Sequence, residues 1–541
     1  MPVKLSESLQ IYFKKLWLEV HSPVFSGKLS SLRRSSLAES IFRMSMNASD
    51  QLQKPLTRNI IRRSIFGTDI TTFENFMLNH WEMQPLYLAR CSKLLQEQDD
   101  IFSSIKKTLA FDENFQDLSL FLQKLVSCPP ITSDELDILG YLEEARCHLG
   151  LPISYQQDIR VLKTEHMKGE VHYFQEDSHI LCKHDILRCD RAFEDGYTIA
   201  LRGMEFRLKK IAEIVDGLAS LFGQPSAGIN MYITPPNSQG LARHYDDHCV
   251  LVVQLYGVKK WTVYCKSGPD LPRLYGSFNS LNVMEASNLS GDDTCLQYLL
   301  KEGDVLYIPR GFPHEAHTVV DNDMTRSSLH LTLSLEVELP FEWEGFVHVA
   351  FFSWNHKQNK SDQSSSDPLS TILNDLALKL VHVSISLLAN SYPTFQKACL
   401  VGAVPEPSDS CDWLSTNQRE IFRELIKQVE AESNFLYIVK HMSSSLEKNE
   451  DPLQQLRWLR NLEDDSAEKH VSLANEHIIL CNRYKDEAGA AFCQVKSRFC
   501  SEVVFDEARP YYIQLLKKYR KTREKYMNGM LLGFADADCL M

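Results

Sequence analysis

The sequence predicts an α+β protein in which a sandwich or jelly roll of short strands lies between two helical regions. One observation is a series of β-rich runs after Gly228, separated by turn residues and without intervening helices: INMYI, VLVVQLY, KWTVYC, DVLYIP and SLHLTLSLEV. A second is the helix-like periodicity on both sides of these runs. A third is the length of 541 residues, which is too great for one core and predicts more than one domain.

Composition limits the class of protein. A hydrophobic fraction of 44% and a charged fraction of 24% are typical of soluble globular proteins. The net charge of -13 argues against a protein dominated by contacts with a nucleic-acid backbone. Fourteen cysteines without any CxxC pair indicate reduced intracellular thiols. The amino terminus lacks an apolar signal core, no run of eighteen apolar residues occurs, and the ending DCLM is not a prenylation box. We therefore expect a cytosolic or nuclear protein.

The part of the chain before the β-rich runs is expected to be mostly helical. Residues 1–65 have scattered apolar positions and predict a loosely helical segment. A capping box, with Thr71 as the N-cap and Glu74 three residues later, predicts the start of a packed helix. The stretch QPLYLAR reads as a strand. Helical and short extended segments alternate from about 115 to 225.

The part after Pro340 is again expected to be helical. Residues 266–304 predict loops, and residues 355–368 a polar, Ser-rich linker. A long helix from Leu369 to Leu388 has an apolar surface too large for a solvated helix, so it packs on its own chain or on a second copy. Breaks at 402–412 and 443–452 divide the remainder into smaller helical units. The expected domains are an amino-terminal segment (1–65), a domain at 66–345 with its β core at 228–340, a linker and long helix that form a dimerisation region (346–405) and a carboxy-terminal helical domain (406–541).

The run HYDDH between two apolar segments raises the question of a metal site. In a strand, residues i and i+2 share a face, so His244 and Asp246 would project side by side. A site of two histidines and one carboxylate needs one further imidazole and leaves coordination positions open. His314 follows a strand and a Gly/Pro turn, His317 lies further into the loop, and His330 lies within an alternating strand. Any of the three could complete the site, and a polar turn rich in histidine is the alternative.

Three motifs in the same order resemble the JmjC ribosomal oxygenases, which are iron- and 2-oxoglutarate-dependent protein histidyl hydroxylases. The motifs are YITPPNSQGLARHYDD, GDVLYIPRGFPHEA and SLHLTLS. The stretch TFENFMLNHWEMQPLYLAR also resembles the amino-terminal segment of that family. The likeness extends from about Thr72 through Val337. It implies a double-stranded β-helix core (the jelly-roll or cupin form of JmjC domains), followed by a dimerisation region and a winged-helix-like region.

The resemblance also implies the roles of individual residues. Fe(II) would be held by His244, Asp246 and His314. A pocket for 2-oxoglutarate would use Asn230, Tyr232, Lys259, His330 and Thr332. An ammonium group suits the distal carboxylate of this cosubstrate. Without the resemblance, Lys259 reads as a surface lysine after a turn at Gly257.

Partners follow from the same resemblance. It implies molecular oxygen, a protein substrate, a homodimer and a nuclear or nucleolar location. The leading reading is hydroxylation of a histidine of a ribosomal protein. Demethylation of N-methyl-lysine on histones uses the same ligand set, and a non-catalytic jelly-roll scaffold is the alternative from another class.

The sequence departs from the family at three places that adjoin the expected pocket. HCVLV follows HYDD where an acidic and aromatic pair is usual, Arg243 replaces a common proline, and the segment from His314 to His330 is longer and more charged. These changes leave the iron ligands intact and bear on the substrate. Outside the likeness, six Lys/Arg lie between Lys517 and Lys525. They predict a solvated helix face, with a ribosomal or nucleic-acid contact as the alternative.

Overall fold

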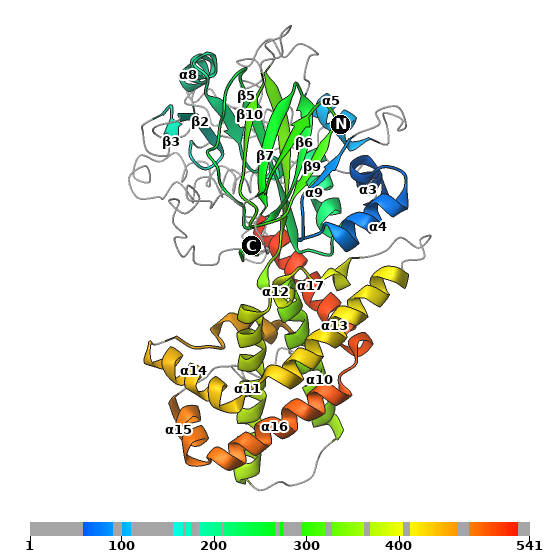
Figure 1. The fold of residues 1–541 in the computed structure, drawn as a ribbon, viewed down its shortest axis with the longest axis vertical. Helices are drawn as coiled ribbons and strands as arrows, with labels where there is room; N and C mark the ends of the chain where they lie inside the picture. Colours follow the sequence, from blue (N-terminus) through cyan, green and yellow to red (C-terminus); the bar gives the residue numbers. More distant parts are fainter. Residues whose placement is uncertain are drawn as a thin grey trace, which may run out of the picture.

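The structure is a computed structural model of the chain, in which a β sandwich stands above a region of helices (Figure 1). It describes residues 58–89, 100–109, 155–165, 169–174, 181, 183–206, 209–265, 271–273, 294–319, 327–361, 368–403, 412–448, 450–462 and 475–527. The sandwich is the predicted jelly roll. It consists of a large and a small antiparallel sheet.

The large sheet has the strand order β1-β9-β6-β11-β5-β4-β2-β3, and the small sheet has the order β10-β7-β8. The strands of the large sheet are β1 (Leu86–Leu88), β2 (Ile159–Glu165), β3 (Gly169–His172), β4 (Thr198–Leu201), β5 (Ser226–Thr234), β6 (Cys249–Tyr256), β9 (Val305–Ile308) and β11 (Ser328–Glu336). Those of the small sheet are β7 (Lys259–Cys265), β8 (Thr294–Leu300) and β10 (His314–Thr318). All five predicted runs form strands. The prediction of loops throughout 266–304 is wrong at β8, which pairs with β7 along its whole length.

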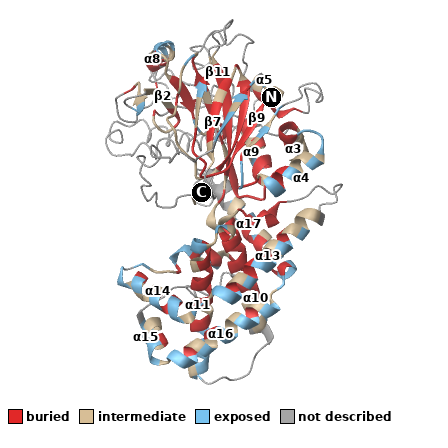
Figure 2. Ribbon diagram, in the orientation of Figure 1, coloured by how far each residue is buried: buried red, intermediate tan, exposed pale blue. Residues whose placement is uncertain are grey.

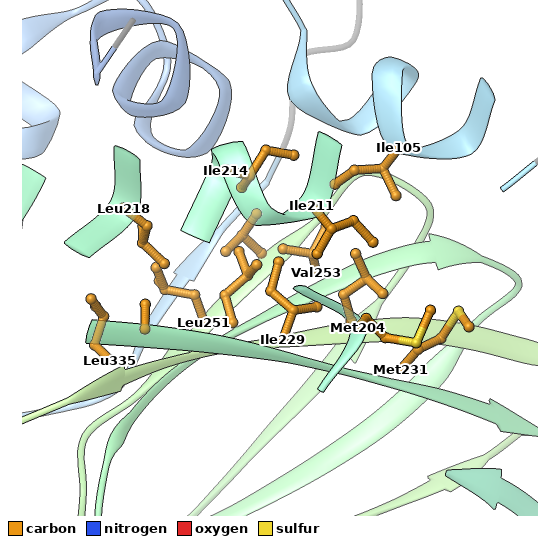
Figure 3. Close-up of a cluster of buried hydrophobic side chains, with 14 of the residues drawn as sticks. Ile105, Met204, Ile211, Ile214, Leu218, Ile229, Met231, Leu251, Val253 and Leu335 are labelled. Atoms are coloured by element: carbon orange, nitrogen blue, oxygen red, sulfur yellow. The ribbon is translucent and has the colours of Figure 1, made fainter. Parts of the chain in front are cut away.

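Strict alternation decides which residues of the large sheet reach the interior of the sandwich. In β11, Leu329, Leu331 and Leu333 are buried in the core on the outer face of the sheet, so His330 and Thr332 point between the sheets. Helix α9 (Lys209–Leu221) covers that outer face, and its isoleucines pack on strands β5 and β6 (Figure 3). A second apolar cluster lies inside the sandwich. The sheet therefore offers an apolar face to the helix and a mixed face to the cavity.

Helices of the amino-terminal half pack beside the sandwich. They are α3 (Arg58–Phe66), α4 (Ile70–Asn79), α5 (Ile101–Leu109) and α8 (Lys183–Glu194), with a short 3-10 turn η2 (Met204–Phe206). The prediction of Thr71 as the N-cap is wrong. Asp69 caps α4, because its side chain accepts a hydrogen bond from the backbone N of Thr71 at 3.0 Å. An ionised carboxylate is a stronger acceptor than a hydroxyl for the free N–H groups of a first turn.

The carboxy-terminal region is helical at every element that the structure describes beyond residue 343. Its helices are α10 (Trp343–Ser361), α11 (Pro368–Ser391), α12 (Pro393–Gln396), α13 (Asp412–Glu432), α14 (Phe435–Glu447), α15 (Asn475–Arg483), α16 (Lys485–Glu502) and α17 (Phe505–Met527). Three 3-10 segments accompany them: η4 (Leu339–Phe341), η5 (Leu400–Gly402) and η6 (Gln454–Leu462). The linker predicted at 355–368 begins later, because α10 continues to Ser361; residues 362–367 lie outside the described part.

Helix α11 is the long apolar helix that the sequence predicts. It is long and apolar enough to cross a membrane, yet 61% of its most apolar window is buried within the protein, as in the core helix of a soluble domain. Leu373, Leu376 and Leu380 lie in the helical core, whereas Ile372 is 48% exposed. Figure 2 shows buried residues along the inward faces of the packed helices. Most of the apolar surface of α11 is therefore covered by its own chain.

Helix α17 joins the two regions, running from the helical bundle towards the sandwich (Figure 1). The Arg520 guanidinium donates hydrogen bonds to the carbonyls of Ala219, at 3.0 Å, and Gln224, at 2.6 Å, at the end of α9. Lys518 donates to the carbonyl of Asn461 at 2.6 Å. Part of the basic run in this helix thus makes contacts within the chain, and the carbonyl end of α9 gains a cation that its dipole favours.

Candidate metal centre and cosubstrate pocket

The predicted metal ligands come together at one end of the sandwich. His244 and Asp246 lie in the segment before β6, not within a regular strand as expected, and His314 is the first residue of β10. An isolated antiparallel bridge pairs His244 with His314. The N–H of Gly311 donates to the carbonyl of Asp246 at 2.9 Å. The two ligand-bearing segments are therefore held to each other by backbone bonds that do not depend on the side chains.

The ligand atoms of His244, Asp246 and His314 lie within 4.8 Å of one another, and no other such group of potential ligands occurs among the described residues. His314, not His317 or His330, is thus the third member. The Nδ1 atom of His244 lies 2.7 Å from the carbonyl of Ala242, and that of His314 lies 3.0 Å from the carbonyl of Phe312. Since a carbonyl only accepts, each Nδ1 carries the proton, and each Nε2 presents its lone pair to a metal.

The charge states suit a metal centre. Burial, with a contribution from His244, lowers the pKa of His314 to about 4, so this imidazole is neutral near pH 7. For Asp246, burial alone raises the pKa, but His248, His314 and His244 outweigh it and the net shift is downward. A carboxylate and neutral imidazoles are the forms that coordinate a divalent cation. The set fits Fe(II), which such sites of two histidines and one carboxylate hold with positions left open.

The turn that carries His314 is anchored by a fully buried arginine. The Nε atom of Arg310 donates to Glu82 at 2.7 Å, and its Nη1 atom donates to Glu342 at 3.2 Å. Its guanidinium also donates to the carbonyl of Gln396. The other carboxylate oxygen of Glu82 accepts a hydrogen bond from the N–H of Ala398 at 2.6 Å. The amino-terminal helices, the ligand turn and the helical region thus meet at one buried side chain.

A cavity of about 210 Å³ is lined by the three ligands and by all five residues that the sequence assigned to 2-oxoglutarate. Four of the five face each other on neighbouring strands: Asn230 pairs with Thr332, and Tyr232 pairs with His330. The rings of Tyr232 and His330 stack with centroids 4.9 Å apart. Strand alternation accounts for this grouping, because the intervening residues face the helix-covered core.

Lys259 reaches the cavity because the chain changes sheets at Gly257. A hairpin would have set Lys259 beside Leu255, but β6 belongs to the large sheet and β7 to the small sheet. Gly257 has a φ of 68° and lies so close to Ser327 that a Cβ would meet the carbonyl oxygen at 2.1 Å. Only glycine makes this turn without strain. Lys259 is consequently 3% exposed instead of solvated.

The inner end of the cavity holds polar groups that lack a partner. The Nζ atom of Lys259 donates to Thr234 at 2.8 Å, and burial lowers its pKa to about 7. The Nδ1 atom of His330 and the Nε1 atom of Trp261 are buried and have no hydrogen-bond partner within the described part of the chain. Buried polar atoms are rarely left in this state. A ligand with an anionic, oxygen-rich end satisfies them, and the distal carboxylate of 2-oxoglutarate has this chemistry.

The departures from the family pattern lie around the mouth of this cavity. Arg243 stacks over Tyr264, with 3.9 Å between the guanidinium carbon and the ring centroid, and pairs with Glu315 at 3.3 Å. His248 and Glu315 line the cavity. His248 bonds Asp247 at 2.9 Å. Cys249 points the other way, into the core behind the large sheet. The charged residues 320–326 lie outside the described part of the chain.

Sequence reasoning missed Thr234, which accepts a hydrogen bond from Lys259, and several residues of the cavity wall. Thr234 is two residues beyond Tyr232 and shares its face, so the alternation rule could have identified it. Arg160 and Thr198 lie on β2 and β4, in the part of the chain where elements were read only coarsely, and Arg202 follows β4. A charged residue within the buried strand pattern of β2 was the available signal for Arg160.

The jelly roll, the ligand triad and the adjoining cationic pocket define the class of iron- and 2-oxoglutarate-dependent oxygenase domains. The JmjC domain family matches residues 204–339, which contain the triad and the five pocket residues. The chain therefore contains a JmjC domain, and the curated relatives that it matches include ribosomal oxygenases.

Individual relatives give the extent of the likeness. The bifunctional lysine-specific demethylase and histidyl-hydroxylase NO66 of Aedes aegypti is 26% identical over 268 residues, 49% of this chain and 33% of the relative. Ribosomal oxygenase 1 of Homo sapiens is 47% identical over 111 residues, 20% of this chain and 15% of the relative. The chain thus spans a third or less of the length of these two relatives. The solved structure of the Escherichia coli ribosomal oxygenase YcfD matches with a TM-score of 0.26 and 14% identity, over 79% of this chain and 95% of that chain.

Proposed function

We propose that the protein is an Fe(II)- and 2-oxoglutarate-dependent dioxygenase that hydroxylates a protein side chain, a histidine of a ribosomal protein. One observation carries the first part: the ligand triad and a buried, unneutralised lysine line the same cavity. An iron ligand set alone fits many sites. The lysine adds a requirement for a carboxylate at a fixed distance from the metal.

The residues of the cavity have distinct roles in such a reaction. His244, Asp246 and His314 would hold the metal, and a site with three protein ligands would leave positions open for the cosubstrate and oxygen. Lys259 and Thr234 hold the distal carboxylate and so orient the cosubstrate. Burial raises the pKa of Tyr232 to about 12, so its hydroxyl remains a hydrogen-bond donor at neutral pH. When bound, iron with 2-oxoglutarate supplies the chemistry that activates oxygen, yields succinate and places one oxygen atom on a substrate C–H bond.

The substrate assignment is supported by the printed names of the relatives, ribosomal oxygenase and histidyl-hydroxylase. One of those names also includes lysine-specific demethylase, so histone N-methyl-lysine is the second candidate. The cavity disfavours it. Arg160 and Arg202 line the wall, and a trimethyl-lysine would bring a third cation beside two guanidinium groups. A neutral imidazole meets no such repulsion.

The test is incubation with iron, 2-oxoglutarate and peptides from ribosomal proteins and histone tails, followed by mass spectrometry. The proposal expects a ribosomal peptide that gains one oxygen atom at a histidine β-carbon, only when both cofactors are present, and no product with His314→Ala. Release of formaldehyde from trimethyl-lysine peptides, with no oxygen gained by ribosomal peptides, would establish the demethylase instead. Absence of iron binding would instead support a non-catalytic jelly-roll scaffold.

A homodimer and a nuclear or nucleolar location complete the proposal. The apolar face of α11, which suggested a partner, is mostly covered within the chain. The support that remains comes from exposed apolar side chains near the end of the helical region, Leu436 and Tyr437 on α14 and Ile479 on α15. Sedimentation of the full-length protein beside a 1–345 fragment tests it, and a monomeric full-length protein excludes the dimer.

A further inference from the structure

Two arginines in the wall of the cavity have no ion-pair partner among the residues that the structure describes. Arg160 lies on β2, opposite Ala200 of β4, and Ala200 in turn lies opposite Tyr232 of β5. Arg202 is two residues beyond Ala200, so both side chains share the inner face of the sheet with Tyr232. Both line the same cavity as the ligand triad. They occupy the β2 and β4 side of it, whereas Lys259 and Trp261 come from β7.

Neither guanidinium group is neutralised within the described chain. The Nε atom of Arg160 is buried and has no hydrogen-bond partner, and neither side chain takes part in an ion pair. The contrast with Arg243 at the same mouth is direct, since Arg243 is paired with Glu315 and stacked on Tyr264. Arg160 is half-buried, and its desolvated Nε–H without a partner costs stability. Arg202 is exposed, so its charge is solvated in the free protein and available to a ligand at the cavity wall.

Binding of iron and 2-oxoglutarate does not supply the missing negative charge. The two positive charges of iron and the one of Lys259 are balanced by the carboxylate of Asp246 and the two carboxylates of 2-oxoglutarate. Glu315, the other acidic group of the wall, is used by Arg243. The loaded cavity therefore retains the positive charges of Arg160 and Arg202. Both line the same cavity as Tyr232 and Asp246, and both act electrostatically on the hydroxyl of Tyr232.

We propose that Arg160 and Arg202 bind a carboxylate of the substrate segment, next to the residue that is oxidised. The inference rests on the proposed function and narrows its substrate class. Guanidinium groups present paired N–H donors that match the two oxygens of a carboxylate, and they bind it with charge-assisted hydrogen bonds. The substrate would then be a peptide with Asp or Glu beside the target histidine, or one that ends there with a free carboxylate.

Binding without turnover tests this directly. Fluorescent nonapeptides with a central histidine in a Gly/Ala background carry a single Asp at each flanking position in turn, and matched peptides carry Asn. A further pair ends directly after the histidine, with a free or an amidated terminus. Fluorescence anisotropy is measured without oxygen, with iron(II) and 2-oxoglutarate present. One Asp position, or the free terminus, should bind at least about tenfold more tightly than its uncharged match, as expected for hydrogen bonds between charged groups.

The variants identify the residues responsible. Arg160→Gln with Arg202→Gln should remove the preference and leave the affinity of the Asn peptides within about twofold. Arg191→Gln, which removes an exposed charge on α8, should leave the preference for carboxylate peptides unchanged. Circular dichroism verifies that each variant is folded. The proposal is wrong if no carboxylate peptide binds more tightly than its match, or if the preference survives in the double variant. Incubation of the same peptides in air then tests the two proposals separately. If the protein keeps its preference for carboxylate peptides but adds no oxygen to them, only the proposed hydroxylation is wrong.

Discussion

The backbones of His244 and His314 pair with each other: each N–H donates to the carbonyl of the other, at 3.1 and 2.8 Å. Both side chains also bond a carbonyl two residues earlier in their own segment. The spacing and the proton positions of the two imidazoles are therefore set before any metal arrives. This preorganisation gives definite expectations for removal of single ligands.

Replacement of His244 or Asp246 by alanine should abolish 2-oxoglutarate turnover and leave the fold intact. The backbone bonds of both residues persist in the variants, because they involve only N–H and carbonyl groups. Succinate production, the bound iron content and circular dichroism are the measurements. Wild-type succinate production by a folded His244→Ala protein would contradict the ligand set.

Lys259→Ala should weaken 2-oxoglutarate binding by about 3–5 kcal/mol, because the distal carboxylate loses the buried cation that pairs with it. Iron affinity should change little. Lys260→Ala is a matched control, since Lys260 is the next residue on β7 and does not line the cavity. Calorimetric titration gives both affinities. Equal affinity for 2-oxoglutarate in the Lys259→Ala and Lys260→Ala proteins would show that Lys259 does not contribute to cosubstrate binding.

The affinity for 2-oxoglutarate should fall as pH rises. Burial lowers the pKa of Lys259 to about 7 in the free protein, so above this pH the amine is mostly neutral and must take up a proton to bind a carboxylate. Burial and Lys259 hold the pKa of the neighbouring His330 well below its usual range, so it stays neutral and adds no slope. The dissociation constant should rise about tenfold per pH unit above the pKa of Lys259.

Titrations between about pH 6 and pH 9 measure this dependence. Repeating them in two buffers with different ionisation enthalpies counts the protons taken up. Lys259→Arg, which stays charged, should lose the slope. A flat profile in the wild-type protein would mean that Lys259 is already charged before the cosubstrate binds.

Glu82→Gln should lower both stability and metal affinity. The substitution leaves Arg310 short of a buried carboxylate, and breaking such a pair costs about 3–5 kcal/mol. Because Arg310 precedes Gly311, whose N–H bonds Asp246, the loosened turn should also weaken metal binding. Urea denaturation and cobalt titration measure the two effects. Arg419→Gln, in a pair whose side chains are 43% and 54% exposed, should change stability by less than about 1 kcal/mol.

Local patterns predicted the parts of the fold that depend on local physics. The alternation in SLHLTLS sets the cavity side of β11. His244 and Asp246 lie together as predicted, although they belong to the segment before β6 and not to a regular strand. The choice of His314 over His317 and His330 needed the pairing of β10 with the segment before β6, which is a contact between distant parts of the chain. Patterns of neighbouring residues cannot predict such a contact.

Lys259 shows the same limit more sharply. Its burial depends on the change of sheet at Gly257 and on the close approach of Ser327, neither of which is visible in the neighbouring residues. Arg310 is a second example. A lone arginine in a Pro-Gly turn reads as a surface residue, yet its carboxylate partners come from far along the chain in both directions.

The position of Arg310 has a consequence for how the protein matures. Its partners include Glu342 and the carbonyl of Gln396, and the N–H of Ala398 bonds the carboxylate of Glu82. A ribosome that has completed the β sandwich has not yet released these later groups. The ligand turn therefore stays incompletely anchored until the start of the helical bundle has emerged. We expect nascent chains cut before residue 398 to capture iron poorly, so that metal uptake follows the emergence of the first helices after the β sandwich.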